Sequence, residues 1–390
     1  MRRISGLVLL AFLATALALL VSCSASSSGT SAAADDDSAV DDDDDNDDAS
    51  PVDDDVSPDD DVSPTDDDAS PVDDDASPAD DDTWPAMNSG TTATLTAVWG
   101  TAHDDVFAVG YEVGKNDVVL HYDGTAWSAM ATGTSGFLYA VWGAAPSAVF
   151  AVGSDAENET GVILQYDGSA WAPMTGSFTG LTLNGVWGTA ATDVFAVGYN
   201  TVAQTSAILH YDGSSWTPAP SSVNCALAAV WGLSDQDAFA VGTGAETSHA
   251  DDDTMVDYYG QAFQYEGSTW SVSEATFGEM GPVGVWGAAS TDVFAIGNDL
   301  SVDAGQPVLF HFDGSTWTAD DSFTPLYMGG IWGAAHDDVF AVGDDVYHFD
   351  GTAWSAMKSG SNGLVGVWGT GPDDVFAVGA NGVIIHYAGS

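Results

Sequence analysis

One repeated phrase dominates this sequence of 390 residues. It first reads LTAVWGTAHDDVFAVG, from Leu95 to Gly110, and edited copies follow to the C-terminus. Its Trp-Gly pair occurs seven times at a mean spacing of about 45 residues, a period typical of a propeller or a solenoid. These tryptophans are Trp99, Trp142, Trp187, Trp231, Trp286, Trp332 and Trp368.

Each repeat consists of short apolar runs separated by turn residues, with no helical period. The AHDD stretch, 102–105, and the Asp123-Gly124 pair should form the tight turns of the first repeat. Its four strands, a to d in order, are then expected at 95–100, 106–111, 118–122 and 127–130. Four antiparallel strands in a repeat of this length predict a propeller blade.

The two ends of the repeat region complement each other. The last repeat stops at HYAGS, after strand c, whereas an unmatched TWPAM, 83–87, precedes the first repeat. Joined, they read HYAGSTWPAM, closely similar to HFDGSTWTAD at 311–320. We therefore predict an all-β fold over 83–390, a seven-bladed β-propeller of four-stranded antiparallel blades closed by an N-terminal strand.

Residues that recur in every blade indicate packing rather than chemistry. All 14 tryptophans fit this pattern at two per blade, and we expect them to be buried in the core. An aspartate also recurs just before strand b and should hydrogen-bond turn amides. The second set of tryptophans is Trp84, Trp127, Trp171, Trp216, Trp270, Trp317 and Trp354, and the aspartates are Asp105, Asp193, Asp237, Asp292, Asp338 and Asp374.

The N-terminus predicts export. Arg2 and Arg3 precede an apolar run at 7–21, which is typical of a secretory signal, here 1–22. The run ends in LVSC, which resembles the lipobox of bacterial lipoproteins and implies cleavage before Cys23 and lipidation of its thiol. Ser24, rather than Asp, follows the cysteine, and the resemblance then implies an outer-membrane protein, lipid-anchored and either periplasmic or surface-exposed.

Residues 23–82 predict a disordered acidic linker. The segment consists of Asp runs separated by Ser-Pro and contains no aromatic residue, so it cannot bury enough apolar surface to fold. We expect it to act as a spacer between membrane and propeller, with at most diffuse cation binding.

Charge excludes nucleic acid as a partner. The chain has 59 acidic residues, 34 of them in the repeat region, against four basic ones. Phosphate neutralisation needs basic side chains that are absent here. The acidic surface instead predicts a soluble monomer.

The repeat L-x-A-V-W-G, V-F-A-V-G, I-L-H-Y-D-G, W resembles the BNR or Asp-box type of propeller, including propellers of the photosystem assembly factor kind, over 83–390. It is also similar to tandem repeats of lipoproteins from myxobacteria and related bacteria. Asp123 and Trp127 are four positions apart, where the Asp-box has five. The resemblance implies fold and not function. Sialidases of this type hold substrate with three arginines, and no arginine follows Arg3, which excludes that activity.

The recurring histidines do not predict a metal site. His121, His210, His311, His348 and His386 occupy the same strand-c position in five blades, so they cannot converge on one ion. Cys225 is the one cysteine apart from Cys23, and we expect a small buried residue.

The loops that vary between blades are where ligand binding is expected. The loops from b to c and from d to the next a should emerge on one face. The largest insertion, 243–260 in the fourth blade, could bind Ca²⁺ or another ligand. Its candidate residues are His249, Asp251, Asp252, Asp253, Asp257, Tyr258 and Tyr259. Further acids on this face are Glu157, Glu159, Asp299, Asp303, Asp320 and Asp344.

We therefore expect a non-enzymatic binding or scaffolding module for an envelope protein or glycan, without a required cofactor. One alternative is a glycan-active hydrolase or lyase that uses carboxylates on the variable face. Another is a lectin with equivalent pockets between blades.

Overall fold

The computed structural model describes residues 84–114, 117–221, 223–250, 253–300, 307–320, 323, 325–361 and 363–389, with the backbone alone at 247–250, 253–256, 274–276 and 307–308. The predicted signal peptide (1–22), Cys23 and linker (23–82), together with Thr83, Asp251, Asp252 and Asp303, lie outside the described residues.

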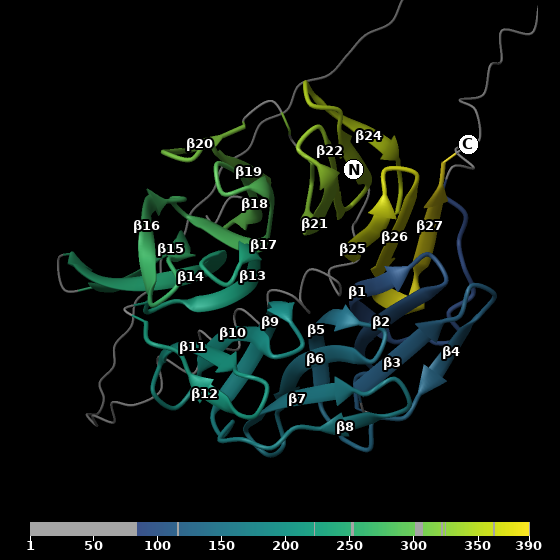
Figure 1. The fold of residues 1–390 in the computed structure, drawn as a ribbon. Coiled ribbons are helices and arrows are strands. Elements are labelled where there is room, and N and C mark those ends of the chain that lie inside the picture. Colours follow the sequence, from purple (N-terminus) through teal and green to yellow (C-terminus); the bar gives the residue numbers. More distant parts are fainter. Residues whose placement is uncertain are drawn as a thin grey trace, which may run out of the picture. The chain divides into compact units, whose positions relative to one another are not determined.

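Seven antiparallel sheets form a ring, which confirms the predicted β-propeller (Figure 1). The innermost strands contact one another in succession around the ring, and the first also contacts that of the last blade. Blade 1 comprises β1 (Thr94–Ala102), β2 (Asp105–Tyr111), β3 (Asp117–Tyr122) and β4 (Trp127–Met130). The strands therefore extend into the predicted AHDD turn, because Ala102 pairs with Asp105 and leaves two residues to make the turn.

The other blades repeat this order from the inner to the outer strand. Blade 2 comprises β5 (Phe137–Ala145), β6 (Ala148–Asp155), β7 (Thr160–Tyr166) and β8 (Trp171–Pro173), and blade 3 comprises β9 (Leu181–Ala190), β10 (Asp193–Asn200), β11 (Thr205–Tyr211) and β12 (Trp216–Pro218). Blade 4 comprises β13 (Ala226–Ser234), β14 (Asp237–Ala250), β15 (Asp253–Tyr265) and β16 (Trp270–Thr276), and blade 5 comprises β17 (Met280–Ala289), β18 (Asp292–Asp299), β19 (Pro307–Phe312) and β20 (Trp317–Ala319). Blade 6 comprises β21 (Met328–Ala335), β22 (Asp338–Gly343), β23 (Val346–Phe349) and β24 (Trp354–Lys358), and blade 7 comprises β25 (Leu364–Gly371), β26 (Asp374–Gly379), the short 3-10 turn η1 (Ala380–Gly382) and β27 (Ile384–Ala388).

The N-terminal segment supplies the fourth strand of blade 7, as the sequence predicts. Ala86 forms an antiparallel bridge with Ile385, and the Met87 amide donates to the Ile384 carbonyl at 2.8 Å. Trp84 is buried and stacks on Tyr387, with ring centroids 5.3 Å apart. The equivalent pair in blade 1, Tyr122 and Trp127, has the same centroid separation. The ring is thus closed by residues from opposite ends of the repeat region.

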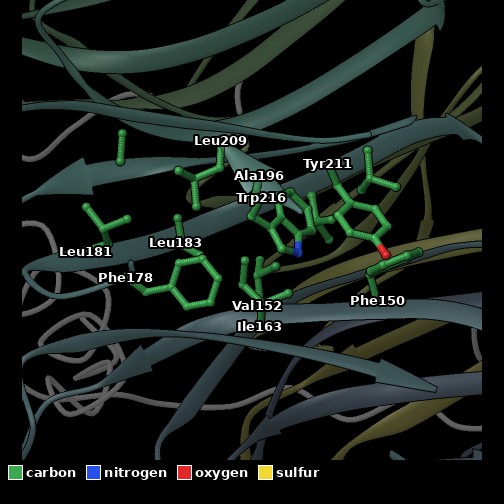
Figure 2. Packing of buried hydrophobic residues seen from close by; sticks show 13 residues of the cluster. Phe150, Val152, Ile163, Phe178, Leu181, Leu183, Ala196, Leu209, Tyr211 and Trp216 are labelled. Atoms are coloured by element: carbon green, nitrogen blue, oxygen red, sulfur yellow. The ribbon is translucent and has the colours of Figure 1, made fainter. Parts of the chain in front are cut away.

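Apolar side chains fill the space between neighbouring blades. Figure 2 shows one such cluster, between blades 2 and 3, in which Trp216 and Tyr211 lie beside Phe150. The Trp216 ring meets Phe150 edge-on at 6.3 Å between centroids, an arrangement favoured by the aromatic quadrupole. Seven such clusters join the blades around the ring.

The prediction that all 14 tryptophans are buried is wrong in part. Seven are buried, and the other seven are only half-buried. Strand-a rings such as Trp99 lie over the Trp-Gly glycine of the next blade, and this contact covers only part of the indole. In the described part of the chain, no helix has the length and apolarity needed to cross a bilayer.

Candidate functional site

The strand-c histidines each pair with an aspartate of their own blade. The His121 Nε2 lies 2.7 Å from Asp105 Oδ1, and the same contact recurs at 2.6 Å in four further blades. The other pairs are His210 with Asp193, His311 with Asp292, His348 with Asp338, and His386 with Asp374. Within the described residues, no three His, Cys, Asp or Glu side chains gather as a metal site would require.

These pairs also correct the predicted role of the aspartate before strand b. Among the described residues, its side chain contacts the strand-c histidine rather than turn amides. In three blades it also contacts a threonine two residues after the Trp-Gly tryptophan: Asp105 with Thr101, Asp193 with Thr189, and Asp374 with Thr370. Each histidine ring also lies 4.0 to 4.6 Å, centroid to centroid, from the strand-b phenylalanine. A Phe–His–Asp unit that recurs in five blades and is engaged within its own blade serves packing.

The turn amides are instead bound by a different aspartate, the one in the turn from strand c to strand d. The Asp212 Oδ1 accepts from the Ser214 and Ser215 amides, each at 2.9 Å, and from Ser214 Oγ at 2.7 Å. The hydroxyl and the two amides lower the pKa of Asp212 to about 2. The same arrangement and the same low pKa occur at Asp123, Asp167, Asp313 and Asp350. This face of the ring is therefore built from constant, internally bonded turns.

The fourth-blade insertion is a protruding extension of the hairpin formed by β14 and β15 (Figure 1). In its register, His249 lies opposite Thr254, Asp253 opposite Ala250, and Asp257 opposite Glu246. Positions 253 and 257 alone are about 13 Å apart along a strand. The described residues of the predicted site are thus spread along the hairpin, and its calcium binding stays a prediction.

The two tyrosines of this insertion differ in their surroundings. Tyr258 lies opposite Ala245 and is half-buried. Tyr259 lies opposite Gly244, and a Cβ added to Gly244 would lie 2.4 Å from the Tyr259 ring. The Tyr259 side chain packs on the core between blades 3 and 4. Cys225 belongs to that core and is buried, as the sequence predicts. Burial raises the pKa of its thiol to about 12. The thiol is therefore not a nucleophile near neutral pH.

Exposed apolar side chains mark the face of the variable loops. The three most exposed large apolar residues of the described chain are Val113 (82 %), Val202 (75 %) and Leu326 (72 %). Val113 and Val202 lie between strands b and c of blades 1 and 3, and Leu326 lies between strand d of blade 5 and strand a of blade 6. All three therefore lie on one face of the ring.

Hydrogen bonds hold two of these loops in place. The Asn200 Oδ1 accepts from the amides of Val202 and Ala203, and the Thr201 amide donates to the Gly180 carbonyl at 2.7 Å. In the other loop, the Leu326 amide donates to Asp344 Oδ2 at 3.2 Å. The Val202 and Leu326 loops are therefore tethered while presenting apolar side chains to solvent.

An aromatic group lies on the same face. Tyr111 ends strand b of blade 1, and its ring lies 4.6 Å from that of Phe137 and 6.3 Å from that of Tyr139, both in blade 2. Burial raises the pKa of Tyr139 and of Tyr327 in blade 6, and Tyr111 raises both further by charge repulsion. Tyr111, Phe137 and Tyr139 thus join blades 1 and 2 at this face.

This set of apolar and aromatic residues was not predicted from the sequence. The available signal was a bulky apolar residue inside a loop otherwise rich in Gly, Asn and Thr, as at Val113 and Val202. The acids named for this face have structural partners in part. Asp344 accepts from the Leu326 amide and from the Tyr347 hydroxyl.

A polar pocket lies between the outer strands of blades 2 and 3. Its volume is about 350 Å³, at the lower end of the range for small-ligand sites. Gln165 and Met174 of blade 2 face Tyr211, Ser215 and Trp216 of blade 3 across it.

Comparison with solved structures supports the fold. The structure titled YCF48 bound to D1 peptide matches with a TM-score of 0.57 and 14 % identity over 79 % of this chain and 96 % of that chain. YCF48 from Cyanidioschyzon merolae matches with a TM-score of 0.56 and 14 % identity over 78 % and 98 % of the two chains. The GH74 enzyme of Niastella koreensis matches with a TM-score of 0.56 and 14 % identity, over 78 % of this chain.

These similarities show a propeller fold alone, because all identities are low. The chain spans about half the length of the GH74 enzyme, 53 %. No protein-family model and no curated protein matches the sequence.

Proposed function

We propose that this chain is a non-enzymatic binding module that takes a protein segment on the face of its variable loops. The observation that supports it most is the confinement of Val113, Val202 and Leu326 to that face, each more than 70 % exposed. Because these loops are already held by hydrogen bonds, binding a partner loses little conformational entropy. Burial of the exposed apolar side chains would then favour binding. This is the surface expected of a docking site.

Charge restricts the partner further. The repeat region carries 34 acidic residues and only two basic ones, Lys115 and Lys358. An acidic surface attracts basic partners and repels acidic ones. The proposed ligand is therefore a polypeptide segment that combines apolar with basic side chains. The peptide named with the YCF48 structure is a precedent for a polypeptide ligand on a propeller of similar fold.

The glycan-hydrolase alternative has less support. It requires two carboxylates at a defined separation across a substrate cleft, whereas Asp344 is engaged within its own loops. The recurrent Asp and His side chains are engaged in pairs within five of the seven blades. The GH74 similarity concerns fold.

The binding proposal is tested with a library of random displayed peptides. The protein should enrich apolar and basic sequences, and acidic substitutions at Val113, Val202 and Leu326 should abolish that enrichment. Acidic substitutions at Leu233 and Val272, which are exposed at 45 % and 46 % elsewhere in the fold, serve as a matched control.

The proposed location is the outer membrane. A lipid on Cys23 would anchor the protein, and the linker 23–82 would connect this anchor to the propeller. Replacement Cys23→Ser should release the protein from the membrane fraction and abolish metabolic labelling with a fatty acid. If the variant stayed in the membrane fraction and still incorporated the fatty acid, a lipid anchor on Cys23 would be ruled out.

A further inference from the structure

The pocket between blades 2 and 3 occurs where the repeat departs from its own pattern. Five blades place a histidine on strand c and an aspartate at the start of strand b. Blade 2 has Gln165 and Ala148 at these positions. Blade 4 has Gln264, but keeps its aspartate, and the Gln264 Nε2 donates to Asp237 Oδ1 at 3.4 Å. Blade 2 alone has lost both members of the pair.

This double replacement removes a ring and a carboxylate from the interface. In the five blades with the pair, the imidazole covers the strand-b phenylalanine at 4.0 to 4.6 Å. In blade 2 that phenylalanine is Phe150, and the strand-c residue beside it has no ring. Gln165 forms no side-chain hydrogen bond with any residue in the described ranges. Its amide therefore lines the pocket with its donor and acceptor both available.

The remaining walls combine two largely buried aromatic rings with hydroxyl groups. Tyr211 and Trp216 (Figure 2) stack on each other at 5.2 Å between centroids. The Trp216 Nε1 donates to the Met174 sulfur at 3.2 Å. Ser215 and Thr175 line the pocket beside them. Asp167 is the only charged lining residue, and it disfavours an anion.

We infer that this pocket binds a neutral sugar residue, either a free sugar or a unit of a longer glycan. Sugars present hydroxyl groups that donate and accept, which a free amide and serine hydroxyls can match. They also present apolar C–H faces that pack on aromatic rings. Because a strand-c amide without a side-chain partner occurs in one described blade, binding should occur at one site per chain.

The test measures binding of glucose, galactose, mannose and N-acetylglucosamine, and of a glycan array, to the full-length protein by calorimetry and saturation-transfer NMR. The double replacement Gln165→His and Ala148→Asp restores the histidine–aspartate pair and removes the free amide from the pocket. It should weaken binding at least about tenfold while retaining or raising the midpoint of thermal unfolding. Binding of free sugars and array glycans alike would indicate a monosaccharide site, and binding of glycans alone an extended site, both within the proposal.

Two further variants keep the result interpretable if the double variant fails to fold. Gln165→Ala should weaken binding by removing the amide alone. Gln264→His introduces a histidine beside Asp237, outside the pocket, and should leave binding unchanged. The inference is overturned if no probe binds the wild-type protein, if Gln165→Ala binds as tightly as wild type, or if several sugars bind per chain. None of these outcomes bears on the peptide site, which lies on other residues.

Discussion

Trp368 in blade 7 lies directly over Gly100 in blade 1, so the last repeat packs on the first. A Cβ on Gly100 would lie 2.8 Å from Trp368 Cη2 and 2.6 Å from the Asp105 carbonyl oxygen. The same contact joins each pair of neighbouring blades: Trp99 on Gly143, Trp142 on Gly188, Trp187 on Gly232, Trp231 on Gly287, Trp286 on Gly333, and Trp332 on Gly369. The Trp-Gly pair of the repeat is therefore an interface between blades.

The replacement Gly100→Ala should destabilise the protein by about 1 to 3 kcal/mol, because the new methyl group overpacks a rigid backbone and a buried ring edge. The matched control is Gly371→Ala on β25, where a Cβ would meet nothing within 4 Å. Its effect should stay within about 0.5 kcal/mol. Urea unfolding measures the free energy of unfolding of both variants. Equal effects would show that the contact with Trp368 does not exclude a side chain at position 100.

The replacement Trp84→Ala should cost about 3 to 5 kcal/mol, as for other buried tryptophans. Trp84 meets Phe340 and Tyr387 much as Trp171 meets Phe107 and Tyr166. Trp171→Ala should therefore cost a similar amount of unfolding free energy. A neutral Trp84→Ala would contradict closure of the ring by the N-terminal segment.

The turn aspartates should stabilise the fold in a pH-dependent way. Hydrogen bonds lower the pKa of Asp212 from 3.8 to about 2, so the folded state favours the carboxylate. The resulting stability is present above pH 3.8 and is lost as the pH falls toward 2. The wild-type protein should be more stable than Asp212→Asn at pH 6, and the two should converge near pH 2. A difference independent of pH would contradict this account.

The Cys225 thiol should make stability depend on pH in the opposite direction. Burial raises its pKa from 9.0 to about 12, so the stability that the neutral thiol contributes is full below pH 9 and declines from pH 9 to 12. In a Cys23→Ser background, a thiol reagent should modify the native protein at pH 8 far more slowly than the unfolded chain. Equally fast modification of both would show that the thiol is accessible. Cys225→Ala should flatten the decline in stability.

Most of the fold could be predicted from the sequence because the same pattern of strands and turns recurs seven times. The strands, the two tryptophans per blade and the pairing of 84–87 with the last blade were all predictable from spacing and alternation. The partners of the aspartates were not, because two aspartates lie near the same face in four of the seven repeats. In the folded chain, Asp105 faces His121 while Asp123 binds the turn amides.

The candidate sites were less predictable because they depend on side chains from different blades. Tyr111 and Phe137 belong to neighbouring blades, and only the packing of the two blades brings their rings together. The pocket at Gln165 likewise depends on Trp216 of the next blade. For the fourth-blade insertion, by contrast, a ligand site was predicted from the acidic composition. The strand register distributes those residues along a hairpin.

The central claim is that the face of the variable loops binds a polypeptide. Its most direct test is enrichment of displayed peptides by three proteins: wild type, the variant Val113→Asp/Val202→Asp/Leu326→Asp, and the control Leu233→Asp/Val272→Asp. Wild type and control should both enrich apolar and basic peptides, and the triple variant should bind the enriched peptides at least about tenfold more weakly. Equal binding by the triple variant and the control, or no enrichment by wild type, would contradict the claim.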